Sequence, residues 1–320
     1  MATRTAGDES MATRPSPRRR FFRSQQASEE LWAYLFISPW VIGFLIFTAG
    51  AMAYSFGVSF WETNFLNKTD FVGFDNYQRM VDDPLFAKSL RNTFLYTGLT
   101  VPLATIIALG IALLLNQRIR FSAFFRTVYY LPAVVAGVAV ALLWAWVLDP
   151  NDGLVNNLLR VVGIDGPRWF SSEQWAMPGV VMIALWGTGT NMLLYLAGLQ
   201  SIPTDLKEAA RIDGAGPVRA FFGVTLPLLT PTVFFNVVLN TIAAFQVFTE
   251  PYVIAKGGPN NATLTMVMYL YKRGFGEFGS FEFGYASAIA WALFAIILGF
   301  TLVLVRSQSR WVHYEGGLRP

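Results

Sequence analysis

Charged side chains gather in one short motif, which holds Glu208, Arg211 and Asp213 beside the small residues Ala209 and Ala210. No acid, base and nucleophile stand together there, so its chemistry is electrostatic recognition rather than catalysis. The alanines permit close approach of another backbone, and the charges orient a binding partner. We interpret the motif as a surface that docks into a partner protein; an ordinary connecting turn is the alternative.

The motif is predicted to form a helix of about two turns over Leu206–Asp213. Asp205 and Glu208 have the spacing of a capping box. Gly214 suits the left-handed residue that ends many helices, and Pro217 discourages the helix from continuing. Because so short a helix is unstable alone in water, it must be held by the rest of the protein or by a partner.

The elements that position this helix are long and apolar. Charged residues make up only 14% of the sequence, against about 25% in soluble proteins. Six windows lack Asp, Glu, Lys and Arg: Leu31–Trp61, Asn92–Gln117, Thr127–Leu148, Gln174–Thr204, Ala220–Thr249 and Phe283–Val305. Each exceeds the roughly 20 residues that cross a bilayer, and continuous runs favour helices over barrel strands. We therefore predict an all-α polytopic membrane protein with six transmembrane helices, near 33–58, 94–115, 127–148, 176–199, 226–249 and 284–305.

The distribution of positive charge predicts the orientation of these helices. If the six helices alternate, 15 of the 24 Lys and Arg residues lie on the side that holds both termini, and nine lie on the other. Positive residues favour the cytoplasmic side, so both termini are expected in the cytoplasm. The predicted domains are a basic tail at 1–30, a transmembrane domain at 31–310 that includes a cytoplasmic loop at 201–223, and a second tail at 311–320.

Several function classes lack the residues that they need. The chain has no cysteine, and its single histidine, His313, lies near the end of the sequence, which argues against a metal site or a metalloenzyme. A net charge of +4 spread over membrane-flanking loops does not indicate nucleic-acid binding. The sequence holds no phosphate-binding loop and no ionisable residue within a predicted span, so neither ATP hydrolysis by this chain nor ion coupling is expected. No cofactor is predicted.

Neutral hydrogen-bonding residues do occur within the spans. Thr188 and Asn191 lie three residues apart on the predicted fourth helix, and Asn240 and Gln246 lie on the fifth. Such side chains often join helices to one another in membranes. They would equally suit a path for a neutral, hydroxyl-rich solute, because a buried amide without a partner is costly. The residues alone leave both interpretations open.

The segment Glu208–Pro227, EAARIDGAGPVRAFFGVTLP, resembles the EAA motif of ABC transporter permeases. Glu208-Ala209-Ala210, Gly214 and Leu226-Pro227 stand at that motif's spacings, and Val224 replaces its isoleucine. The DGA at Asp213–Ala215 is similar to the carbohydrate branch, the maltose-type permeases. The segments VGFDNYQRM, LRNTFLYT, KGGPNNAT and FGYASAIA match the same branch.

This resemblance implies the type I importer permease fold, a place in the bacterial plasma membrane and a set of partners. It implies a second, homologous permease subunit, a dimer of ATPase subunits that binds ATP and Mg²⁺, and an extracellular solute-binding protein. In the family, the motif helix couples to the ATPase, which gives this role to Glu208, Ala209, Ala210, Asp213 and Gly214.

The resemblance also implies a sugar site. Gly187, Thr188, Asn191 and Asn240 fall where maltose-type permeases line their solute path, whereas Ala243 stands where that family can carry a stacking aromatic residue. We predict a permease subunit of an ATP-driven importer of a sugar or oligosaccharide, not itself an enzyme. A stand-alone secondary carrier of a neutral polar solute and a permease for a polyol or glycerol phosphate are alternatives; the absence of Lys and Arg from the spans argues against the phosphate.

Overall fold

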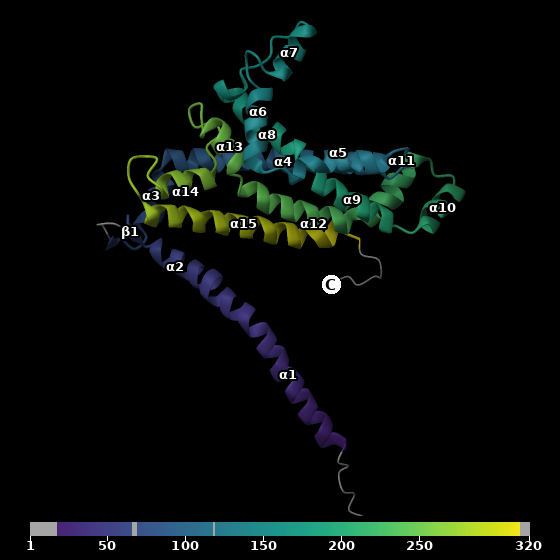
Figure 1. Cartoon of the computed structure of the whole chain (residues 1–320), viewed down its shortest axis with the longest axis horizontal. Helices are drawn as coiled ribbons and strands as arrows, with labels where there is room; N and C mark the ends of the chain where they lie inside the picture. The colour runs from purple at the N-terminus through teal and green to yellow at the C-terminus, as the bar shows by residue number, and fades with distance from the viewer. Residues whose placement is uncertain (1–17, 66–68, 118, 314–320) are drawn as a thin grey trace, which may run out of the picture. The chain divides into compact units, whose positions relative to one another are not determined.

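Except for one short hairpin, the regular elements that the structure describes are helices (Figure 1). The computed structural model describes residues 18–65, 69–117 and 119–313. Its contacts divide the chain into two units, Met1–Ser55 and Phe56–Pro320, and each is described by itself.

The first unit is a single helical rod. α1 (Arg18–Gly43) runs into a π-helical turn, η1 (Phe44–Gly50), and then into the start of α2 (Ala51–Val58). The stretch Ser28–Val58 is apolar and long enough to cross a membrane. The predicted span near 33–58 is therefore confirmed. The predicted polar tail at 1–30 is helical from Arg18, and residues 1–17 lie outside the described part.

Three further helical runs are long enough to cross a membrane. They are α4 (Pro84–Leu115), the run Pro217–Ala255 and α15 (Phe283–Trp311). α4 begins ten residues before its predicted start, because the Asp83 carboxylate accepts hydrogen bonds from the backbone N–H groups of Leu85 and Phe86. The run Pro217–Ala255 joins α11 (Pro217–Ala220), the π-helical η3 (Phe221–Thr225), α12 (Leu226–Phe245) and α13 (Thr249–Ala255).

The predicted third and fourth spans are each broken into two helices. α5 (Ser122–Val134) meets α6 (Gly137–Val147) at 101°, and α8 (Glu173–Trp186) meets α9 (Gly189–Ser201) at 47°. Six spans are therefore present if each bent pair counts as one. The first break follows Pro132, whose nitrogen has no hydrogen to donate one turn back, and the chain is extended at Val135 and Ala136.

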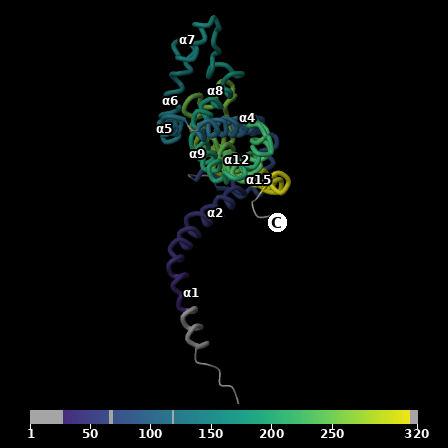
Figure 2. The backbone as a smooth tube through the Cα atoms, turned by 90° about the vertical axis from the view of Figure 1, so that its right-hand side faces the viewer, coloured from purple at the N-terminus to yellow at the C-terminus, as the bar shows by residue number. Residues whose placement is uncertain are grey.

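The core of the second unit forms around α4, which packs on α8, α9 and α12, while α12 also packs on α15 (Figures 1 and 2). Buried residues such as Ala108, Met192 and Leu229 join α4, α9 and α12. Gly189 lets α9 meet α5 closely, since a Cβ atom there would stand 2.3 Å from the Tyr129 carbonyl oxygen. The helices that carry the predicted polar residues are thus held by close packing.

One end of the second unit, here called the hairpin end, carries the short elements. Strands β1 (Trp61–Thr63) and β2 (Thr69–Phe71) pair antiparallel, with Glu62 opposite Asp70, and α3 (Asp75–Asp82) and α14 (Met266–Gly274) pack beside the long helices. This hairpin was not predicted. The opposite end holds α10 (Thr204–Ile212) and α11 (Figure 1). α6 packs against α13 and leads to α7 (Leu154–Val161), which stands off from the long helices, and the short η2 (Trp169–Ser171) packs against α8.

Candidate functional site: an inter-helix pocket and an exposed terminal helix

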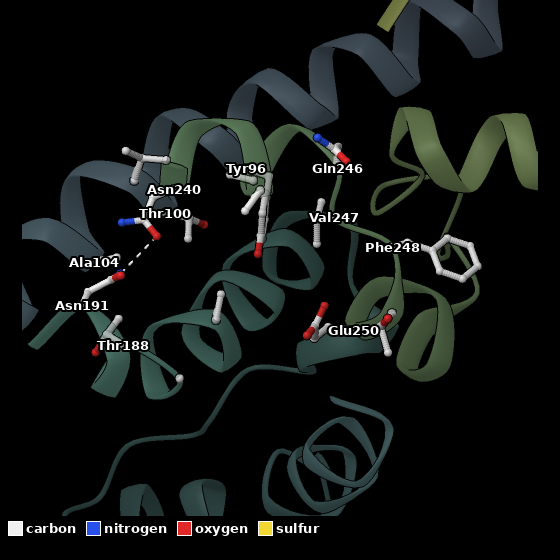
Figure 3. A pocket seen from close by; sticks show the side chains of 16 residues that line it. Tyr96, Thr100, Ala104, Thr188, Asn191, Asn240, Gln246, Val247, Phe248 and Glu250 are labelled. Carbon is white, nitrogen blue, oxygen red and sulfur yellow. Dashed lines mark hydrogen bonds between the residues drawn. The ribbon is translucent and has the colours of Figure 1, made fainter. Parts of the chain in front are cut away.

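A pocket of about 340 Å³ lies between α4, the break between α8 and α9, and the junction of α12 with α13 (Figure 3). The five residues predicted for the solute path all line it: Gly187, Thr188, Asn191, Asn240 and Gln246. Ala243 lines it as well. The structure therefore brings together residues from two predicted spans.

Breaks in two helices place the pocket residues. Gly187 and Thr188 separate α8 from α9, where the Gly187 N–H bonds to the Ala184 carbonyl in a tightened turn and the Thr188 hydroxyl donates to Leu185. Gln246 follows the last residue of α12. Irregular backbone at the depth of a membrane is tolerated where it lines a cavity, which is the position of both breaks.

Two asparagines meet across this pocket. The Asn191 amide donates to the Asn240 side-chain oxygen at 3.1 Å, so the helix–helix hydrogen bond considered from sequence does form. The Asn240 Nδ2 and the Thr100 hydroxyl are buried and have no hydrogen-bond partner among the described residues. The pocket thus keeps donor and acceptor capacity for a bound polar molecule.

Sequence reasoning missed four polar residues of the pocket: Tyr96, Thr100, Thr249 and Glu250. Tyr96 and Thr100 lie one turn apart on α4, inside a window chosen only for its lack of charge. Glu250 is the residue immediately after the charge-free window Ala220–Thr249, and the break after α12 turns it toward the pocket. In Figure 3 the Tyr96 hydroxyl and the Glu250 carboxylate point toward the open centre.

The predicted two-turn helix exists as α10, with a different start. It begins at Thr204, two residues early, and no side chain caps its N-terminus; the residue before it is Pro203. The capping-box role of Asp205 is therefore wrong, because the helix already includes this residue. Glu208 and Ala209 are exposed, and Ala210 is half-buried.

The end of α10 was predicted correctly. Gly214 has a φ of +76°, its N–H donates to the Arg211 carbonyl at 3.0 Å, and the Ala215 N–H donates to the Ala210 carbonyl at 2.9 Å. These two bonds form a Schellman motif. Pro217 does not merely stop the helix: it is the first residue of α11. Asp213 and Gly214 are exposed in the turn between.

Few side chains fasten α10 to the rest of the unit. The Lys207 ammonium donates to the Leu199 carbonyl at 3.3 Å. Within the described part of the chain, Glu208, Arg211 and Asp213 take part in no ion pair. Ile212 is 86% exposed and Val218 69% exposed. Charged and apolar side chains therefore share one uncovered surface at this end.

The hairpin end is tied by a network around Asp83. Its carboxylate accepts hydrogen bonds from the hydroxyls of Tyr269 and Tyr285, the latter at 2.7 Å, and Arg273 lies 3.6 Å away. Burial alone would raise the pKa of Asp83, but the two tyrosines and the backbone N–H groups of α4 hold it below its ordinary value. Burial, with the hydrogen bond to Asp83, raises the pKa of Tyr269 to about 12.

Arg273 extends this network to α3. It donates to Glu282 at 3.3 Å, and Glu282 also accepts from Arg79 at 3.1 Å. The Arg79 guanidinium lies over the Tyr285 ring, 4.3 Å from its centre. Segments far apart in the sequence are thus joined at one end of the unit. Among the described residues, no group of three His, Cys, Asp or Glu side chains is placed to hold a metal ion.

Residues 94–312 match the family described as binding-protein-dependent transport system inner membrane component, and the chain belongs to this family. Its members are transport permease subunits rather than enzymes. The long apolar helices agree with this assignment, and the chain is a membrane protein.

Named relatives and a solved structure agree with the family. The chain is 42% identical to the probable ABC transporter permease protein YesP of Bacillus subtilis, over 90% of this chain and 93% of the relative. It is 35% identical to the sulfoquinovosyl glycerol transport system permease protein SmoG of Agrobacterium fabrum, again over 90% and 93%. A bacterial ABC transporter involved in the import of the acidic polysaccharide alginate contains a chain with a TM-score of 0.76 and 25% identity, over 91% of this chain and 99% of that one. The fold is that of ABC importer permeases.

Proposed function

We propose that this chain is the membrane subunit of an ATP-driven importer of sugars or oligosaccharides, that the pocket lies on the solute path, and that α10 couples the path to an ATPase dimer. Relatives named for a glycoside and a polysaccharide support the solute class. The pocket supports it independently, because its polar side chains are neutral amides and hydroxyls, apart from Glu250.

The observation that carries the proposal is the uncovered surface of α10. A helix this short needs outside support, yet α10 exposes both charged and apolar residues, including Glu208 and Ile212. A partner that covered these residues would bury apolar area and pair the charges. In this proposal the partner is an ATPase dimer that binds ATP and Mg²⁺ and contacts Glu208, Ala209, Ala210, Asp213 and Gly214.

The path for force follows consecutive helices of the chain. α10 leads through the Gly214 turn into Pro217–Ala255, and that run carries Asn240 and Gln246 on the wall of the pocket. Movement of α10 would therefore displace one side of the pocket relative to α9, which holds Asn191. Rigid-body rocking of this kind exposes a site to one side of a membrane and then to the other.

The remaining partners and the orientation belong to the same proposal. α10 and both termini face the cytoplasm, and the hairpin end faces outward toward a solute-binding protein. A second, homologous permease completes the path. Exposed apolar side chains on α5 and α6, among them Leu131, Val134 and Leu142, offer surface for that subunit or for lipid.

The test is uptake of radiolabelled solute into proteoliposomes that hold the complete importer, with and without ATP and the ATPase. We expect uptake only when both are present. Gly214→Val should abolish it, because a β-branched residue is strained at a φ of +76°, while membrane insertion is kept. Gly216→Val is the matched control: φ there is −67°, and a Cβ atom meets nothing within 4 Å.

Each outcome discriminates between functions. Uptake by the chain without ATP would support the stand-alone carrier instead. Full uptake by Gly214→Val would contradict the role of α10. Loss of uptake in both glycine variants would show that the loop tolerates no change, so the positive φ of Gly214 would not be the cause.

A further inference from the structure

The pocket carries one charged side chain. Of the 16 residues that line it, Glu250 is acidic and none is basic. Within the described part of the chain, Glu250 has no ion pair and no hydrogen-bond partner. An uncompensated carboxylate beside a cavity at this depth is unusual, because a charge removed from water is costly unless something stabilises it.

Two helices begin beside this carboxylate. Glu250 lies in the first turn of its own helix, α13. Its Oε1 also lies 3.6 Å from where a Cβ atom on Gly137 would stand, and Gly137 is the first residue of α6. The starts of these two helices thus position the carboxylate at the pocket wall, which no basic side chain lines.

We propose that Glu250 makes the pocket a charge filter, which admits neutral hydroxyl-rich solutes and excludes anionic ones. The proposal rests on the proposed function of the pocket as the solute path. Neutral hydroxyls would meet three groups without a hydrogen-bond partner among the described residues, namely the Glu250 carboxylate, the Thr100 hydroxyl and the Asn240 Nδ2. A sulfonate, phosphate or uronate would meet a like charge, with no basic residue on this wall to offset it.

The absence of cysteine from the chain permits a test that does not require the natural solute. Ala243 and Gln246 are exposed on the pocket wall, so Ala243→Cys and Gln246→Cys each place a single thiol there. Membrane vesicles that hold the full chain are treated with three thiol reagents: the trimethylammonium-ethyl, the sulfonatoethyl and the hydroxyethyl methanethiosulfonates. The neutral reagent measures access, and the ratio of cation to anion rates measures the local field.

With Glu250 intact, the cation-to-anion rate ratio should exceed that of a small thiol in solution at both positions. Adding Glu250→Gln should lower the ratio by about tenfold, whereas Glu250→Asp, which keeps the charge, should preserve it. A ratio equal to that of the free thiol would overturn the filter. A ratio that Glu250→Gln leaves unchanged would overturn its assignment to Glu250.

This test separates failure of the filter from failure of the proposed function. The reagent rates report the field in the pocket whether or not the chain transports sugar. The predicted rate ratios without ATP-dependent uptake would support the charge filter and contradict the importer function. ATP-dependent uptake with rate ratios equal to that of a free thiol would support the importer function and contradict the charge filter.

Discussion

The two ends of the second unit are built in opposite ways. At the hairpin end, Asp83 binds two tyrosines and the start of α4, and Arg273 links it to Glu282 and so to α3. At the α10 end, one lysine side chain contacts a backbone carbonyl, and charged and apolar residues face outward. The first end is stabilised by its own contacts, and the second leaves its surface uncovered.

This difference shows where the molecule can respond to a partner. A network in which several hydrogen bonds and charges converge is costly to disrupt, so the hairpin end should behave as a rigid body. A short helix held by few contacts is easily displaced, and binding free energy can be spent on moving it. Changes at the two ends should therefore have separate effects, one on stability and the other on transport.

The largest effect is expected at the α10 end. Glu208→Lys reverses an exposed charge that has no ion pair in the described residues, so the melting temperature should stay within error. Uptake by the complete importer should fall by about tenfold or more, because like charges would meet at the ATPase contact. Asp165→Lys, an exposed charge reversal outside α10, should leave uptake intact. Wild-type uptake by Glu208→Lys would contradict the separate effect of the α10 end on transport.

The hairpin end should show the converse. Asp83→Asn keeps the shape of the side chain but removes the charge that two tyrosines and Arg273 share. We expect a loss of about 2 kcal/mol in the free energy of unfolding, measured as a lower melting temperature in detergent. Asp82→Asn, at the exposed neighbouring position, should cause no loss. Equal melting temperatures for the two variants would show that the network does not stabilise this end.

The smallest effect concerns pH. The pKa of Asp83 is lower in the folded protein than in the unfolded chain, so its contribution is fully present above about pH 4 and is lost as the pH falls through the folded value. The difference in melting temperature between the wild type and Asp83→Asn should thus shrink in acid. A pH-independent difference for Asp83→Asn would exclude the carboxylate as the cause.

Local features of the sequence predicted much of this molecule. Apolar run length gave the spans, and the spaced motif from Glu208 to Pro227 gave α10 and its Gly214 turn. The start of α10 was misplaced because Asp205 has the right spacing for a cap, while the chain after Pro203 already enters the helix.

The missed features depend on contacts between distant residues. Asp83 and Tyr285 are separated by 202 positions, and nothing near either one indicates the other. The 101° bend after Val134 occurs inside an apolar window, where counting charges detects no change. Glu250 was excluded from the pocket because it lies one residue beyond such a window. The position of Glu250 on the pocket wall depends on where α12 ends and on the contact of α6 with α13.

The run Pro217–Ala255 begins beside α10 and ends with α13, whose first turn holds Glu250. Within this run, α12 and α13 meet at the break that places Glu250 on the pocket wall. If movement of α10 displaces this run, the Glu250 carboxylate moves with it. Selectivity between neutral and anionic solutes should then vary through the transport cycle rather than stay constant.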